Sequence, residues 1–158
     1  MKINSDYRDL LSRFNDLGVR YLIAGGYAVM RYTEPFYTKD IDLWVDPVPE
    51  NAARVLAALQ AFGAPTADLT LQDLCTPGVF FQIGIAPNRI DIMTDVPGLT
   101  FAAAWGRAEA FDLGEVTAPV LSRDDIILAK QTANRPQDRI AVRRLKDSMK
   151  LRPRSRPR

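Results

Sequence analysis

Apolar residues between positions 5 and 17 recur every three or four residues, which is the period of an amphipathic helix. The apolar set comprises Tyr7, Leu10, Leu11, Phe14 and Leu17. Ser5 is the predicted N-cap of this helix and Gly18 its predicted stop. The same reasoning predicts helices over residues 27–31, 50–62, 100–110 and 122–133 and a last helix from Pro136, whereas residues 71–75 fit no single type.

Shorter, continuous apolar runs predict strands. They span residues 19–24, 40–45, 79–85, 89–94 and 116–120. The segment Ala86-Pro87-Asn88 between the third and fourth runs is typical of a hairpin turn, so we expect those two strands to pair. The order of elements predicts an α/β (α+β) fold, in which helices cover a mixed sheet and further helices follow at the C-terminal end.

Two aspartates interrupt the second apolar run. Residues i and i+2 of a strand share a face, so Asp40 and Asp42 point the same way while Ile41, Leu43 and Val45 point into the core. Neighbouring carboxylates repel each other unless a cation lies between them. The pair therefore indicates a metal site, although acidic residues on a strand that faces water give the same pattern.

A third aspartate occurs in the run Arg89-Ile90-Asp91-Ile92. Ile90 and Ile92 are expected to face the core, which turns Asp91 to the opposite face. If this strand lies beside the one that carries the aspartate pair, the three carboxylates form a triad. Two could then hold a metal on a triphosphate, and the third could bind metal or accept a proton from an attacking hydroxyl.

A glycine pair, Gly25-Gly26, lies between a predicted strand and a predicted helix. Free backbone N–H groups at a helix start can bind phosphate oxygens, although a simple packing turn has the same sequence.

Composition narrows the choice of chemistry and compartment. The chain has 158 residues, one cysteine and no histidine, so an internal disulfide and histidine chemistry are excluded. Any metal must be held by oxygen ligands, which favours Mg²⁺ or Mn²⁺. No run is long enough to cross a bilayer and no signal-peptide pattern opens the chain, so we expect a cytoplasmic protein without membrane contact.

Basic residues gather at the C-terminal end. We expect a single domain over residues 1–148 and a basic, disordered tail over residues 149–158. The tail is either a solubilising end or an electrostatic arm for RNA.

Taken together, these motifs resemble the nucleotidyltransferase superfamily with a DNA polymerase β-like core. The resemblance is to its small prokaryotic members, which include minimal nucleotidyltransferases, abortive-infection-type toxins and antibiotic-modifying enzymes. It rests on Gly25-Gly26-x-Ala28, on Thr38-x-Asp40-Ile41-Asp42-Leu43 and on Ile90-Asp91-Ile92. The segment Lys130 … Arg135-Pro136-x-Asp138 is similar to a helical motif of the toxin-related branch.

The resemblance implies roles for individual residues. Asp40, Asp42 and Asp91 would be the catalytic and metal-binding carboxylates, with Mg²⁺ or Mn²⁺ as the cofactor. The nucleotide would be bound by Gly25, Gly26, Thr38 and Lys130. Asp138 would position Lys130, although a solvated helix lysine fits the sequence equally well.

The implied reaction moves a nucleoside monophosphate from a nucleoside triphosphate, ATP or another, to a hydroxyl, with release of pyrophosphate. The acceptor could be tRNA or other RNA, or a protein in a toxin–antitoxin pair, with a cognate toxin or antitoxin as partner. The alternatives are an antibiotic-modifying nucleotidyltransferase and a catalytically silent module that binds a nucleotide or a partner.

An RNA acceptor would suit the basic residues near the last helix, although they could equally form a solvated helix face. They are Arg135, Arg139, Arg143, Arg144 and Lys146.

The chain departs from the family pattern at Phe36, because relatives often carry an arginine just before the Thr-x-Asp-x-Asp segment. Loss of that arginine removes a phosphate contact unless Arg31 or Arg89 replaces it, and this is the main support for the silent module.

Overall fold

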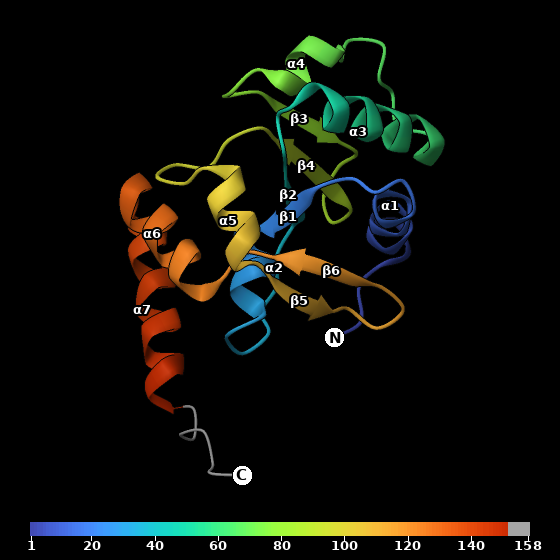
Figure 1. Ribbon diagram of the computed structural model, residues 1–158. Coiled ribbons are helices and arrows are strands. Elements are labelled where there is room, and N and C mark those ends of the chain that lie inside the picture. The colour runs from blue at the N-terminus through green and yellow to red at the C-terminus, as the bar shows by residue number, and fades with distance from the viewer. Residues whose placement is uncertain (152–158) are drawn as a thin grey trace.

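The computed structural model describes residues 1–151, in which one six-stranded sheet is flanked by helices (Figure 1). The strands are β1 (Tyr21–Ala24), β2 (Asp40–Val45), β3 (Phe80–Ile83), β4 (Arg89–Met93), β5 (Glu109–Asp112) and β6 (Thr117–Val120). The helices are α1 (Ser5–Asp16), α2 (Gly25–Met30), α3 (Pro49–Phe62), α4 (Leu71–Cys75), α5 (Phe101–Arg107), α6 (Arg123–Ala133) and α7 (Pro136–Leu151).

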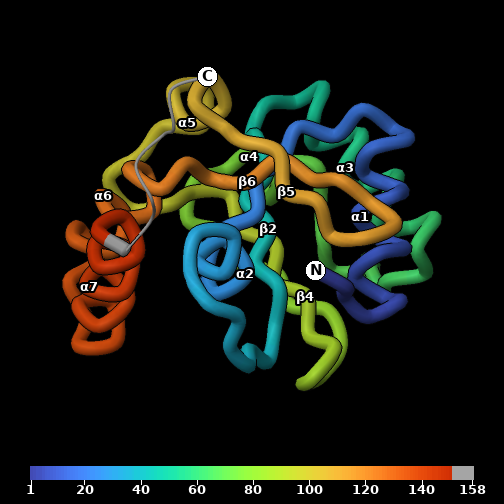
Figure 2. Tube along the Cα trace, turned by 90° about the horizontal axis from the view of Figure 1, so that it is seen from below, coloured from blue at the N-terminus to red at the C-terminus, as the bar shows by residue number. Residues whose placement is uncertain are grey.

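The sheet is mixed, with the strand order β3-β4-β2-β1-β6-β5. β2 pairs in parallel with β4 and antiparallel with β1, while β3 and β4 form the predicted hairpin. α1 packs against α3 on one side of the sheet, and α6 packs against α7 on the other (Figure 2). The expected α/β fold with a mixed sheet and C-terminal helices is therefore confirmed.

The core lies between the sheet and its helices and contains the apolar residues that the strand pattern predicts. Ile41, Leu43 and Val45 of β2 are at most 1% exposed. Trp44, on the other face, is also buried and packs edge-on against Phe101 of α5, with ring centroids 5.1 Å apart. Trp44 therefore fills the core beyond the carboxylates.

Several predicted element ends are wrong. Asn4, not Ser5, caps α1, because the Asn4 side chain accepts a hydrogen bond from the Tyr7 backbone N–H at 2.9 Å. α2 begins at Gly25 rather than after the glycine pair. The helix predicted over 100–110 ends at Arg107, because its last residues join β5 and pair with β6. That pairing overrides the helical propensity of the alanine-rich run.

Two further segments, residues 71–75 and the end of the last helix, complete the comparison with the predicted elements. Residues 71–75, which the pattern left unassigned, form α4 behind a Thr70–Asp73 capping box. α7 continues to Leu151, three residues into the predicted tail, and the remainder of that tail, residues 152–158, lies outside the described residues. Within residues 1–151, no helix combines the length and the apolarity needed to cross a membrane.

Candidate functional site

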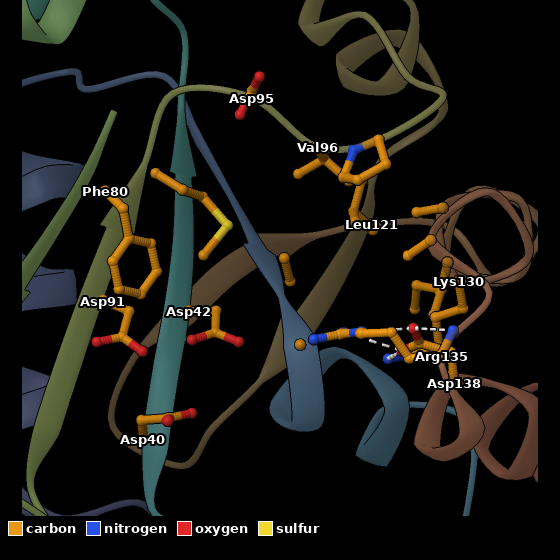
Figure 3. Close-up of a pocket in the computed structure, with 17 residues that line it drawn as sticks. Asp40, Asp42, Phe80, Asp91, Asp95, Val96, Leu121, Lys130, Arg135 and Asp138 are labelled. Carbon is orange, nitrogen blue, oxygen red and sulfur yellow. Dashed lines mark hydrogen bonds and ion pairs between the residues drawn. The ribbon is translucent and has the colours of Figure 1, made fainter. Parts of the chain in front are cut away.

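Three carboxylates meet on one face of the sheet, because β2 and β4 are parallel neighbours in a register that fixes the residue pairs. Asp42 lies opposite Asp91, and Asp40 lies opposite Arg89. Oxygen atoms of Asp40, Asp42 and Asp91 all lie within 4.8 Å of one another. Figure 3 shows the three side chains turned into a common cavity. The structure thus brings together the triad that strand parity predicted.

The triad is electrostatically costly. Burial, followed by the charges of Asp40 and Asp91, raises the pKa of Asp42 to about 7. The pKa of Asp91 is also raised, first by burial and then by the charge of Asp40, and the nearby Arg89 guanidinium offsets part of this rise. A positive charge bound between these groups would relieve the repulsion.

Arg89 supplies one such charge from within the chain. Its Nη2 donates a hydrogen bond to Asp40 Oδ2 at 2.5 Å and another to Asp91 Oδ2 at 3.3 Å. The Arg89 side chain is 34% exposed, whereas that of Asp91 is 3% exposed. Arg89 was considered from the sequence only as a substitute for the missing loop arginine, although its i, i+2 relation to Asp91 already put both on one face.

The glycine pair brings the start of α2 against the carboxylates. Gly25 has a φ of +61°, and a Cβ built on it would lie 1.9 Å from Asp42 Oδ2. Only glycine therefore allows this approach. A Cβ on Gly26 would lie 3.0 Å from Thr38 Oγ1, and the Thr38 hydroxyl donates a hydrogen bond to the Asp40 carbonyl at 3.3 Å. Thr38 thus lies beside the triad and the helix start.

A pair of cations, one from α6 and one from the connection between α6 and α7, lies on the opposite side of the cavity (Figure 3). Lys130 of α6 places its Nζ 3.7 Å from Asp138 Oδ1. Arg135 binds the same carboxylate more closely, through Nε at 2.7 Å and Nη2 at 3.0 Å. Hydrogen bonds from Arg135 hold the pKa of Asp138 below its usual range, so this carboxylate stays ionised and holds both cations in place.

Arg135 is named in the sequence analysis only within the helical motif and among the basic residues near the last helix, and the structure adds that it lines the cavity. Its pKa is raised, mainly by the hydrogen bond to Asp138 and to a smaller extent by the charge of Asp42. The Arg135-Pro136-x-Asp138 motif contains the signal, because the i, i+3 spacing brings a basic and an acidic side chain together at a helix start.

The cavity between the two walls has a volume of about 560 Å³. The carboxylates and Gly25 line one wall, and Lys130, Arg135 and Asp138 line the other. The lining also includes apolar side chains, namely Phe80, Met93, Val96, Pro97, Leu121 and Ile126. Phe80 on the edge strand β3 is 55% exposed. The cavity therefore offers acidic, basic and apolar surfaces to one ligand.

The loop residue Phe36 lies close to this site. A Cβ on Gly26 would lie 3.7 Å from a ring carbon of Phe36. Arg144 of α7 covers the same ring, with its Cζ 4.6 Å from the centroid. Arg31 turns away and donates a hydrogen bond to the Ala110 carbonyl at 3.1 Å. Arg89, rather than Arg31, is therefore the arginine that reaches the triad.

The residues present fit a divalent cation. The donor set consists of carboxylate oxygens, which Mg²⁺ and Mn²⁺ prefer. Among residues 1–151, Asp91 Oδ1 is buried without a hydrogen bond of good geometry, although Arg89 Nε lies 3.3 Å away. Buried polar atoms are seldom left without a partner, so this oxygen is a candidate metal ligand.

Comparison with known proteins identifies the fold. No protein-family model matches the sequence, and no curated protein matches it significantly. The lincosamide antibiotic adenylyltransferase LnuA, solved with lincomycin bound, matches with a TM-score of 0.61 at 15% identity over 93% of this chain and 98% of that chain. A Thermotoga maritima protein described as a nucleotidyltransferase has a TM-score of 0.60 at 16% identity, over 89% of this chain and 90% of its own.

A further similar structure is ANT(2")-Ia in complex with adenylyl-2"-tobramycin. It has a TM-score of 0.58 at 17% identity, over 90% of this chain and 87% of its own. Because identities are 15–17%, the likeness shows the fold alone. The chain thus has a nucleotidyltransferase fold, in agreement with the resemblance drawn from its motifs, while the toxin-like branch receives no support from these structures.

Proposed function

We propose that the protein is a metal-dependent nucleotidyltransferase, which moves a nucleoside monophosphate from a nucleoside triphosphate to a hydroxyl acceptor. The observation that carries the proposal is the triad of Asp40, Asp42 and Asp91, whose oxygens lie within 4.8 Å of one another. The pKa values of Asp42 and Asp91 stay raised even with Arg89 beside the triad, so a further positive charge would be favourable here. The fold of the similar solved structures supports the same assignment.

The chain would bind the triphosphate between the two walls of the cavity. Asp40, Asp42 and Asp91 would hold Mg²⁺ or Mn²⁺, which would neutralise charge on the triphosphate oxygens. The backbone N–H groups of Gly25 and Gly26, with the Thr38 hydroxyl beside them, would bind phosphate oxygens. Lys130 faces the triad from α6 and would bind the outgoing phosphates, with Arg135 beside it.

The reaction forms a bond between the acceptor oxygen and the α-phosphorus and breaks the bond from that phosphorus to the bridging oxygen. Pyrophosphate leaves, and the hydroxyl proton passes to the Asp91 carboxylate. The raised pKa of Asp91, caused first by its burial, makes it a stronger base than an exposed aspartate.

The acceptor in this proposal is RNA, such as tRNA, or a protein side chain within a toxin–antitoxin pair. Basic residues on α7 favour a polyanion, because Arg139, Arg143 and Lys146 line a shallow groove of about 340 Å³ on that helix. In the second case, the cognate toxin or antitoxin would be the protein partner.

A small hydroxylated antibiotic is the second candidate acceptor. LnuA is a lincosamide antibiotic adenylyltransferase, and ANT(2")-Ia was solved with an adenylylated tobramycin. In this chain, the exposed Phe80 and neighbouring Met93 lie at the end of the cavity next to Asp91, where they could contact the apolar face of a small acceptor.

The test is transfer of label from each α-labelled nucleoside triphosphate, with Mg²⁺, into tRNA, total RNA, lysate protein and a panel of hydroxylated antibiotics. The control is the double variant Asp40→Asn/Asp42→Asn. Label that enters one fraction and is lost in the control supports the proposal and identifies the acceptor class. Mg²⁺-dependent nucleotide binding without transfer to any fraction would favour the catalytically silent module instead.

A further inference from the structure

Arg89 competes for the oxygens that a cation would need. Its guanidinium donates to Asp40 Oδ2 at 2.5 Å and to Asp91 Oδ2 at 3.3 Å, and its Nε lies 3.3 Å from Asp91 Oδ1. A cation and a guanidinium cannot both bind these atoms at contact distance, because their positive charges would repel each other. Arg89 therefore competes with the proposed cation for Asp40 and Asp91.

The fold places this competitor in the site. Arg89 and Asp91 share a face of β4, and Arg89 lies directly opposite Asp40 on β2. With its side chain 34% exposed, the guanidinium can move into solvent, whereas the nearly buried Asp91 cannot. The asymmetry allows the arginine to leave while the carboxylates stay in place.

We propose that Arg89 is an internal counter-ion that holds Asp40 and Asp91 together in the cation-free protein and is displaced when the cation binds. This inference rests on the cation site proposed above and adds that Arg89 weakens the binding of a free cation. A cation that arrives with a triphosphate displaces Arg89 more readily, because the phosphates bring additional ligands and negative charge. Arg89 would thereby favour loading of the cation together with the nucleotide.

The opposite role for Arg89 makes the opposite prediction. If Arg89 instead orients Asp40 for the cation, its removal would weaken cation binding. The two roles therefore differ in the sign of one measurable change.

The experiment is a titration of the full chain with Mn²⁺ alone, in which electron paramagnetic resonance counts the free ion. The proteins compared are the wild type, Arg89→Met, Arg89→Lys and the matched control Arg20→Met. Arg20 also forms an ion pair with a buried aspartate, Asp46, with its Nε 3.3 Å from Asp46 Oδ2, and neither residue lines the cavity. Asp42→Asn identifies the binding that belongs to the triad.

We expect Arg89→Met to bind Mn²⁺ about tenfold more tightly than the wild type, because an adjacent positive charge is gone. Arg89→Lys keeps the charge, so its affinity should stay within a few-fold of the wild type, as should that of Arg20→Met. With EDTA present, Arg89→Met should melt at a lower temperature, since the triad has lost its counter-ion.

Equal or weaker Mn²⁺ binding by Arg89→Met, when the wild type binds through Asp42, would overturn the counter-ion role and leave the proposed function standing. If the wild type and Arg89→Met both lack Asp42-dependent Mn²⁺ binding, the cation site itself is wrong. The proposed function would then lose its basis, and the inference would fail with it.

Discussion

Asp42 is the residue at which the electrostatic cost of the site is greatest. Its pKa of about 7, raised first by burial, lies above the value of 3.8 expected in an unfolded chain. The folded state therefore binds this proton more tightly than the unfolded state, and stability falls as the pH rises between these two values. A neutral side chain at position 42 removes this dependence.

We therefore predict that Asp42→Asn stabilises the cation-free protein more at about pH 8 than at about pH 5. The difference between the two pH values should be at most about 3 kcal/mol, because only the two units between pH 5 and the folded-state pKa of about 7 contribute. Urea unfolding of both proteins in EDTA at the two pH values measures this difference in the free energy of unfolding. Excess Mg²⁺ should stabilise the wild type at the higher pH and have no such effect on the variant. An equal free energy of unfolding for both proteins at both pH values would contradict this account of Asp42.

Gly25 is the second residue on which the site depends, and Gly18 provides a matched control. Gly25 has φ +61° and Gly18 φ +68°, but a Cβ on Gly18 meets nothing within 4 Å. An alanine at either position costs about 1–2 kcal/mol for its left-handed backbone. Only the alanine at position 25 also collides with Asp42.

Gly25→Ala should thus unfold at a lower urea concentration than Gly18→Ala and should lose Mn²⁺ binding, which Gly18→Ala retains. Urea unfolding and the Mn²⁺ titration together measure the two effects. If both variants behaved alike in both assays, the close approach of α2 to Asp42 would have no bearing on the site.

At the scale of elements, Asp138 fixes the start of α7 relative to α6. Its carboxylate is 1% exposed, accepts hydrogen bonds from the Arg135 backbone and side chain, and forms an ion pair with Lys130. An amide in its place offers one oxygen instead of two and no charge. The cations on this wall would lose the group that positions them.

Asp138→Asn should cost about 1–2 kcal/mol of stability and weaken binding of a Mg²⁺–nucleotide complex. Asp125→Asn is the matched control, because Asp125 is a buried aspartate of α6 paired with Arg107 at 2.9 Å and does not line the cavity. Calorimetry of nucleotide binding separates the two variants. If Asp138→Asn and Asp125→Asn lowered the nucleotide affinity equally, Asp138 would act only through the stability of the fold.

Elements were predictable where their pattern was local. The alternation in Asp40–Val45 specified both the strand and its buried face, and the Ala86-Pro87-Asn88 turn specified the hairpin. β5 was missed because its formation depends on pairing with β6 rather than on its own residues. Such long-range pairing leaves no periodic signal in a short segment.

At the scale of the whole molecule, the triad could be predicted and its surroundings could not. Strand parity put Asp40, Asp42 and Asp91 on site-facing positions, and only the adjacency of β2 and β4 had to be assumed. The contact of Arg135 with the cavity depends on how α6 and α7 pack against each other, which sequence periodicity does not specify. Arg89 could be placed on the correct face, but its ion pair with Asp40 required the strand register.

The proposed function requires that the triad catalyses attack at the α-phosphorus of a nucleoside triphosphate. The most direct test supplies the protein, Mg²⁺ and the acceptor fraction with triphosphate labelled at either the α- or the γ-phosphate. We predict that the acceptor takes the α-label, that the γ-label appears in pyrophosphate, and that Asp42→Asn abolishes both. Transfer of the γ-label to the acceptor, or its release as orthophosphate, would contradict the assignment, because bond cleavage would then occur at the γ-phosphorus.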